Sequence, residues 1–202
     1  MVPTICRWLV FCSSVEAVAG VEWVGGKRDA AFERARAADA ISIENRFRGL
    51  LERHEARLRR VAYAMLADPH RVEDVLQEAF VRAYRKLPAR FENERQEAAW
   101  LYRIVYRCCL NEIRSKRRRP EAAGLIVDLA ANDDPSDSHV VVQALAALAP
   151  AERAVVLLVD LIGFDYETAA SALGIPRGTV AWRLSVARSR LRAELGELGV
   201  DE

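Results

Sequence analysis

The stretch LIGFDYETAASALGIPRGTVAWRLSVARSRLR, residues 161–192, decides the fold. It predicts two helices joined by a tight turn, with Asp165 capping the first helix. Gly174 supplies the turn, because the positive backbone angle needed there is cheap only for glycine. The second helix has a buried stripe at helical spacing, formed by Val180, Leu184, Ala187 and Leu191. These features together predict a helix-turn-helix.

The second helix of this unit is basic, with five arginines and no acidic residue in residues 177–192. A recognition helix meets base edges with its first turns and phosphates with its remaining cations. The side chains predicted to contact duplex DNA are Arg177, Thr179, Trp182, Arg183, Arg188 and Arg190. Arg177, Thr179 and Arg183 are expected nearest the bases. Arg188, Arg190 and Arg192 are either phosphate contacts or solvated charges, and a surface helix without a ligand is the alternative.

A second basic helix is predicted upstream, over residues 97–117, with seven basic residues and one acidic residue in residues 103–119. Arg103, Arg107, Asn111 and Arg114 share one face of this helix at three- or four-residue spacing. Two aromatic rings, Tyr102 and Tyr106, lie beside this face. Further cations follow at Lys116, Arg117 and Arg118. Rings that stack on bases beside guanidinium groups suit single-stranded nucleic acid. Packing of both tyrosines at the edge of a core, with solvated charges, is an equal alternative.

The remaining apolar patterns also have helical spacing. Helices are predicted over residues 45–67, over residues 69–87 with Asp68 as cap, from about residue 139, and over residues 151–162 after Pro150. No alternating pattern indicates a strand. The fold class is therefore predicted as all-α, with two small helical domains, residues 45–119 and 139–197, joined by a flexible acidic linker, residues 120–138. Residues 1–44 are expected to form a poorly ordered extension.

The helix predicted over residues 69–87 has an outer face of mixed charge around an apolar residue. This face consists of Asp74, Gln77, Glu78, Val81, Arg82 and Arg85. Such a face fits either a protein-docking surface or an ordinary solvated one, and taken alone the solvated face is the better interpretation.

Charge is segregated along the 202 residues although the net charge is only +1. The basic helices point to a polyanionic partner, while residues 121–137 hold five acidic residues and no lysine or arginine. Cys6, Cys12, Cys108 and Cys109 form no metal-binding pair and are expected to be small buried groups in a reducing cytoplasm. We therefore expect no metal or cofactor.

Two further classes are disfavoured by the residues. The short N-terminal apolar run is interrupted by Glu16 and Glu22, so it is not expected to span a membrane. No nucleophile, phosphate-binding or zinc-hydrolase motif occurs, and His54, His70 and His139 have no partners at ligand spacing. We therefore expect a cytoplasmic DNA-binding protein that is not an enzyme, with His54 packed on the first helix.

Three strings, DVLQEAFVRAYRKL at 74–87, WLYRIVYRCCLNEIRSKRRR at 100–119 and residues 147–192, resemble bacterial sigma factors of the extracytoplasmic-function (ECF) group. The resemblance covers about residues 45–195. It implies that the first domain binds the clamp helices of the β′ subunit of core RNA polymerase. The residues so implied are Asp74, Gln77, Glu78, Phe80 and Arg82.

The resemblance further implies that the helix holding Trp100 melts the minus-ten promoter element and captures its bases. The second domain would bind the β flap and read the minus-thirty-five element, and an anti-sigma protein is a further candidate partner. Departures from the family pattern occur at Arg107, Asn111, Ala181, Trp182 and Val186.

Two other classes stay open at this stage. One is a stand-alone helix-turn-helix regulator with a helical sensor or dimerisation domain, which has no need of a basic-aromatic face for melted DNA. The other is an enzyme or ligand-binding domain fused to a DNA reader, against which the absence of a catalytic constellation argues.

Overall fold

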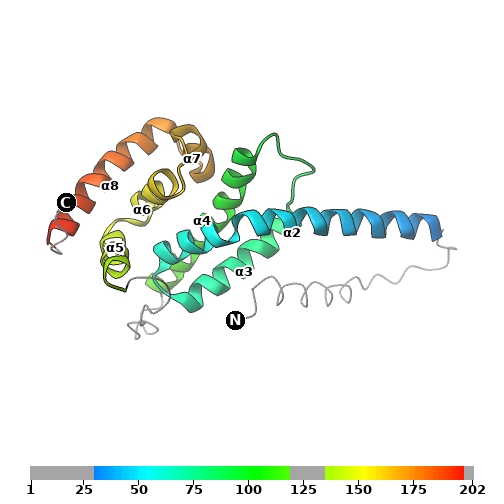
Figure 1. The fold of residues 1–202 in the computed structure, drawn as a ribbon, viewed down its shortest axis with the longest axis horizontal. Helices are drawn as coiled ribbons and strands as arrows, with labels where there is room; N and C mark the ends of the chain where they lie inside the picture. Colours follow the sequence, from blue (N-terminus) through cyan, green and yellow to red (C-terminus); the bar gives the residue numbers. More distant parts are fainter. Residues whose placement is uncertain (1–29, 119–134, 198–202) are drawn as a thin grey trace. The chain divides into compact units, whose positions relative to one another are not determined.

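The computed structural model describes the backbone of residues 30–118 and 135–197, and the side chains of residues 41–116 and 140–196. The described elements are all helical, as predicted (Figure 1). They are α2 (Ala30–Leu66), α3 (Pro69–Arg85), α4 (Glu94–Arg118), α5 (Pro135–Ala147), α6 (Pro150–Val156), the π-helix η3 (Leu157–Leu161), α7 (Tyr166–Leu173) and α8 (Arg177–Glu197). Residues 1–29 of the predicted extension, which was expected over residues 1–44, lie outside the described residues, as does most of the predicted linker.

By internal contacts the chain divides into two compact units, Met1–Leu50 and Leu51–Glu202. The described part of the first unit is the N-terminal portion of α2, where Arg48 pairs with Glu44 at 2.8 Å. Both domains predicted from the sequence fall in the second unit, except for residues 45–50. Helix α2 begins at residue 30 and not at 45, because residues 30–44 are rich in strong helix formers and contain no helix breaker.

Helices α2, α3 and α4 surround a common apolar core in the second unit. The side chains that face it are nearly inaccessible: Leu51, Leu58, Ala62, Met65, Val72, Val75, Leu76, Ala79, Phe80, Ala83, Leu101, Val105 and Cys108. Ion pairs from Arg59 to Glu73 at 2.7 Å and from Arg71 to Glu112 at 3.1 Å connect the three helices at the rim. The spacing of apolar residues predicted this core, although Leu66, Leu87, Trp100, Ile104 and Ile113 are half-buried.

Local signals at the helix ends explain where α3 and α4 begin. Asp68 accepts hydrogen bonds from the backbone N–H groups of His70 and Arg71, and Pro69 takes the first helical position, as predicted. Helix α4 begins three residues before its predicted start, because Asn93 accepts the N–H of Gln96 at 2.8 Å. Asn93 is thus an N-cap that the apolar spacing alone did not reveal.

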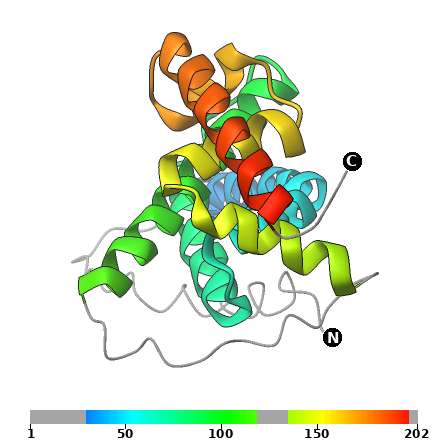
Figure 2. The same ribbon diagram turned by 90° about the vertical axis from the view of Figure 1, so that its left-hand side faces the viewer.

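Helices α5 to α8 form the second cluster, in which α8 packs on α5, α6 and α7 (Figure 2). Helix α5 begins at Pro135, four residues before its predicted start, because proline suits the first turn. The predicted helix over residues 151–162 is α6 followed by the π-helical turn η3, and it ends before Gly163, whose φ is +83°. Val180, Leu184 and Ala187 are buried as predicted, whereas Leu191 is half-buried.

Candidate nucleic-acid interface

The helix-turn-helix forms as the sequence predicts. The Asp165 carboxylate accepts the backbone N–H of Thr168 at 2.8 Å, and these hydrogen bonds lower the pKa of Asp165. Gly174 has φ +69° and ends α7 in the left-handed conformation. The small residues Ala169 and Ala170 of α7 are buried, and α7 packs against both α8 and α4. The turn therefore holds α8 at a fixed angle to α7.

The two halves of α8 differ in how their arginines are used. Arg188 donates to both carboxylate oxygens of Asp160, at 2.6 and 3.2 Å, and this hydrogen bonding raises the pKa of Arg188. Arg190 donates to Glu152 at 2.7 Å. Arg188 and Arg190 therefore hold α8 to the preceding helices, whereas Arg192, the third arginine of this predicted set, is exposed and forms no ion pair among the described side chains.

Two further arginines lie on the N-terminal half of α8. Arg177 is exposed and Arg183 is half-buried, and within the described side chains neither forms an ion pair. Thr179 is half-buried beside them, while Trp182 is exposed. This half combines positive charge, a hydroxyl and an aromatic ring, the groups that read base edges and phosphates.

The predicted nucleic-acid face of α4 is divided. Arg107, Asn111, Arg114 and Lys116 are exposed toward the C-terminal end. The side chains of Arg117 and Arg118 lie outside the described residues. The exposed part extends over more than two helical turns and is free to meet a polyanion.

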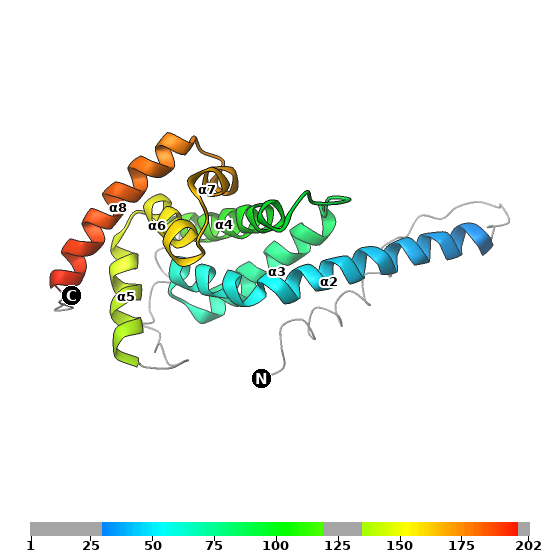
Figure 3. The same ribbon diagram turned by 45° about the horizontal axis from the view of Figure 1, so that its top comes forward.

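The other part of this face is covered by α7 and the loop before it (Figure 3). Tyr102 is 2% exposed, and its ring packs edge-on against Phe164 with centroids 5.3 Å apart. Arg103 donates to the carbonyl oxygen of Ser171, and Arg95 pairs with Asp165 at 3.1 Å. Tyr102 is therefore inaccessible to DNA in this arrangement.

Tyr106 lies half-buried between the two parts of this face. Burial raises the pKa of Tyr106, while the nearby charges of Arg183 and Arg114 oppose the rise. Arg183 on α8 thus lies close to the predicted face of α4. The arrangement brings residues predicted for two different DNA elements close together.

The outer face of α3 keeps most of its predicted members at the surface. Asp74, Glu78 and Arg82 are exposed and Gln77 is half-buried. Phe80 is 1% exposed and lies in the core. Its side chain has no surface to offer a partner, so we remove Phe80 from the polymerase-contacting set.

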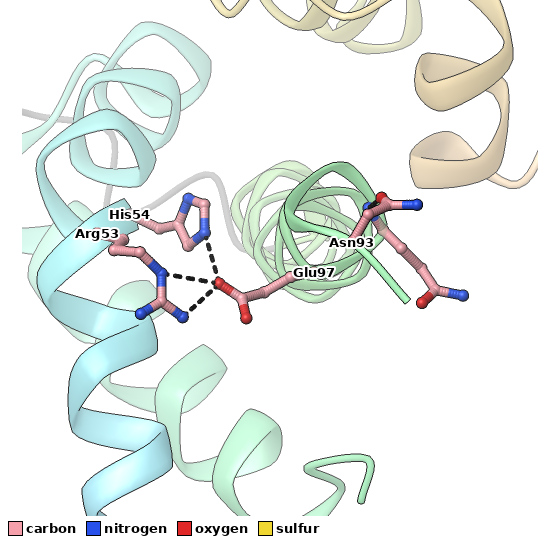
Figure 4. A network of polar contacts seen from close by, with 5 residues as sticks. Arg53, His54, Asn93 and Glu97 are labelled. Atoms are coloured by element: carbon pink, nitrogen blue, oxygen red, sulfur yellow. Dashed lines mark hydrogen bonds and ion pairs between the residues drawn. The ribbon is translucent and has the colours of Figure 1, made fainter. Parts of the chain in front are cut away.

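Glu97 joins α4 to α2 through a polar network that the sequence did not reveal (Figure 4). Arg53 donates to one Glu97 oxygen from Nε at 3.1 Å and from Nη2 at 2.7 Å, and His54 Nε2 lies 3.1 Å from the same oxygen. His54 is buried, as predicted. The network fixes the N-terminal end of α4, from which the predicted DNA face extends.

Arg153 is the second group that sequence reasoning missed. Its side chain is buried at 8% exposure and donates to the carbonyl oxygens of Met65, Ala146 and Leu148 at 2.6, 2.7 and 3.2 Å. Burial lowers the pKa of Arg153, and among the described side chains no carboxylate pairs with it. Arg153, on α6, therefore joins the last turn of α2 to the C-terminal end of α5 and the residue that follows it.

Two other expectations concern cysteines and metals. Cys108 and Cys109 are both buried, as expected, whereas Cys6 and Cys12 lie outside the described residues. Across the described residues, no group of three potential metal ligands comes together. None of the described helices is long and apolar enough to cross a bilayer.

Comparisons with known proteins agree with this geometry. The family model described as Sigma-70 region 2 matches residues 50–119, and the one described as Sigma-70, region 4 matches residues 138–191. The ECF RNA polymerase sigma factor SigM of Mycobacterium tuberculosis is 31% identical over 86% of this chain and 89% of its own length. SigL of the same species is 32% identical over 82% of this chain and 98% of its own length. The match to SigE of Mycolicibacterium smegmatis, 32% identical, spans only 61% of that relative.

Two solved structures share the fold and part of the sequence. The sigma factor RpoE of Bartonella quintana, in complex with the anti-sigma factor NepR, aligns with a TM-score of 0.63 and 27% identity over 77% of this chain and 98% of that one. CnrH in complex with the cytosolic domain of CnrY aligns with a TM-score of 0.58 and 27% identity over 76% of this chain and 90% of that one. The two family models match in order over the segments that contain α4 and most of α8, and the relatives above are ECF sigma factors. This chain therefore belongs to the ECF RNA polymerase sigma factors.

Proposed function

We propose that this chain binds core RNA polymerase and directs it to a particular set of promoters, without catalysing a reaction itself. The observation that carries the proposal is the order of two matched regions, each holding one basic helix. We assign residues 45–119 to the polymerase and the minus-ten element, and residues 139–197 to the β flap and the minus-thirty-five element. The place of action would be the cytoplasm, where polymerase and chromosome are found.

In the first domain we assign two surfaces. The exposed α3 face of Asp74, Gln77, Glu78 and Arg82 offers both charges to the β′ clamp helices. The α4 face binds the non-template strand of the minus-ten element, where cations hold the phosphates and tyrosines stack on bases. The α4 residues assigned are Tyr102, Arg103, Tyr106, Arg107, Asn111, Arg114, Lys116, Arg117 and Arg118.

Promoter melting then requires α7 to move away from α4. Tyr102 and Arg103 contact Phe164 and Ser171 in the structure, so they reach a base only after these contacts break. The exposed residues from Arg107 onward are free to make the first contacts with DNA. The covered arrangement is therefore a resting form, and polymerase binding favours the open one.

In the second domain, Arg177, Thr179, Trp182 and Arg183 on the N-terminal half of α8 would read the minus-thirty-five duplex. Arg188 and Arg190 are reassigned to holding α8 in place, because both already bind carboxylates. An anti-sigma protein is a further proposed partner, since the sigma factor RpoE, of 27% identity, is held in a complex with the anti-sigma factor NepR.

The test is run-off transcription from a genomic fragment library with bacterial core polymerase, with and without this protein. We expect new transcripts that depend on the added chain and share two upstream sequence elements. The matched variant Arg107→Ala should reduce open-complex formation, whereas Glu52→Ala on the exposed side of α2 should not. Binding of the chain to paired duplex half-sites without polymerase, and no chain-dependent initiation, would instead indicate a stand-alone regulator.

A further inference from the structure

Trp182 on α8 is 63% exposed, the largest exposed fraction of any large apolar side chain in the described residues. It has no role in the packing of α8, which buries Val180, Leu184 and Ala187 instead. A single exposed apolar residue needs no explanation by itself. The exposed stripe on which Trp182 lies, and the arginines on the same half of α8, indicate a role in binding.

Gly178, Trp182, Ser185 and Ser189 form one exposed stripe at helical spacing, on the side of α8 away from the core. Nothing lies within 4 Å of the position that a Cβ atom at Gly178 would take. Glycine and serine have short side chains, so the indole of Trp182 projects furthest from the helix axis among the four residues of the stripe. When α8 enters a groove, Trp182 comes nearest to its floor.

The charges around Trp182 favour nucleic acid over an apolar protein partner. Arg177 and Arg183 lie within five residues of it, and neither forms an ion pair among the described side chains. Two unpaired cations on the same half of α8 as an exposed ring, one on either side of it around the helix, can bind phosphates of both strands while the ring meets a base.

An indole offers an apolar ring surface and one N–H donor, with no acceptor. In the major groove, thymine presents a C5-methyl group and the O4 acceptor. Cytosine presents an N4 amino donor and no methyl group, and the purines have no methyl group there. Thymine is therefore the base that satisfies both parts of the Trp182 side chain.

We propose that Trp182 selects a thymine in the minus-thirty-five element, with its ring against the methyl group and its N–H directed at O4. This inference rests on the proposed function, because it requires α8 to occupy the major groove. It adds a specificity-determining residue to the helix.

The test begins with the full chain assembled with bacterial core polymerase, which selects duplexes from a pool randomised over the upstream element. Each enriched thymine is then replaced by deoxyuridine, which lacks the methyl group and keeps both O4 and the paired adenine. At one position we expect wild-type affinity to fall about fourfold, the effect of losing one buried methyl-sized group.

Two variants and a control identify the side chain responsible. Trp182→Ala should bind the thymine and deoxyuridine duplexes equally. Trp182→Phe keeps an apolar ring without the N–H, so it should retain the thymine preference with weaker binding. Ser189→Ala, on the same stripe but further along α8, should behave as wild type. Circular dichroism of each variant checks that the helices are intact.

Each outcome decides one question. Equal wild-type affinity for thymine and deoxyuridine at every enriched position, or an unchanged preference in Trp182→Ala, overturns the inference while the sigma-factor function stands. Loss of polymerase binding in Trp182→Ala assigns the residue to a protein interface and also overturns it. If the wild-type chain forms no complex with core polymerase, the proposed function itself fails.

Discussion

Tyr102 shows what burial does to a single ionisable group. Its hydroxyl is buried with no hydrogen-bond partner in the described structure, and burial raises its pKa from 10.0 to about 12 against the opposing charges of Arg57 and Arg60. Because the folded pKa is the higher one, this group's contribution to stability is complete below pH 10 and is lost as the pH rises toward about 12.

We expect Tyr102→Phe to raise the free energy of unfolding by up to about 1 kcal/mol near neutral pH, since it removes an unsatisfied buried hydroxyl. The variant should also lose less stability than wild type between neutral and alkaline pH. Urea unfolding followed by circular dichroism measures both effects, with the half-buried Tyr166→Phe as control. A destabilised Tyr102→Phe would mean that the hydroxyl does have a partner.

Two residues with positive φ form a matched pair for backbone strain. Ala67 has φ +51° and Gly174 has φ +69°. A left-handed alanine costs about 1–2 kcal/mol, and a glycine costs about 0.5–1 kcal/mol in chain entropy. Ala67→Gly should therefore stabilise the fold by about 0.5 kcal/mol.

Gly174→Ala should destabilise the fold by about 0.5 kcal/mol through the backbone alone, because the left-handed strain of alanine exceeds the chain entropy that it saves and nothing crowds the added Cβ. Thermal and urea unfolding of the two variants should shift in opposite directions. Shifts of the same sign would show that neither left-handed conformation persists in solution.

At the scale of the element, different arginines of α8 are expected to bind DNA and to hold the helix in the fold. Arg183→Ala should cost about 1–3 kcal/mol in DNA binding at one promoter position, if it reads a base, with the free energy of unfolding unchanged. Arg188→Ala should instead lower the free energy of unfolding by up to about 1 kcal/mol, because it breaks the pair with Asp160. Quantitative footprinting and urea unfolding distinguish the two. An equal loss across all promoter sequences in Arg183→Ala would identify a phosphate contact.

Local signals explain how far the sequence alone could go. Asp68, Asp165 and Gly174 act through hydrogen bonds and backbone angles within a few residues, so their roles could be predicted from their neighbours. The buried stripe of α8 follows from spacing alone. The helical fold and the basic faces could be derived on this basis.

Contacts between distant segments could not be predicted in this way. Arg153 binds Met65, 88 residues away, and Arg188 binds Asp160 across a turn. An arginine whose partners are carbonyl groups has no signature in the sequence, because every residue carries such a group. The covering of Tyr102 by Phe164 likewise depends on how α7 meets α4.

At the scale of the molecule, Arg153 connects helices from both matched sigma regions. Arg153→Met keeps the apolar stem but leaves three carbonyl groups without their donor, so we expect a loss of about 2–4 kcal/mol in the free energy of unfolding. Arg153→Lys should recover only part of this loss, because an ammonium group lacks the planar fork. Urea unfolding measures both variants, and wild-type stability in Arg153→Met would show that water satisfies these carbonyl groups.

The contact between α4 and α7 sets the balance between resting and open forms. Phe164→Ala removes the ring against Tyr102, which contributes about 0.5–1.5 kcal/mol beyond its buried area. The free chain should then bind a single-stranded minus-ten oligonucleotide several-fold more tightly, as measured by fluorescence anisotropy. Val141→Ala, at an exposed site on α5, is the control. Unchanged affinity in Phe164→Ala would mean that the contact does not limit access.

The adjacent buried thiols of Cys108 and Cys109 report on opening of the core of the first domain through their rate of alkylation. Burial raises the pKa of Cys109 to about 12, and alkylation requires the thiolate at an accessible position. Iodoacetamide will therefore modify the peptide carrying both cysteines no faster than the core around α4 opens. Mass spectrometry of that peptide during transcription initiation measures the alkylation rate. If the first domain moves away from α7 as a rigid body, this rate stays unchanged. If the core of the domain loosens, the rate rises.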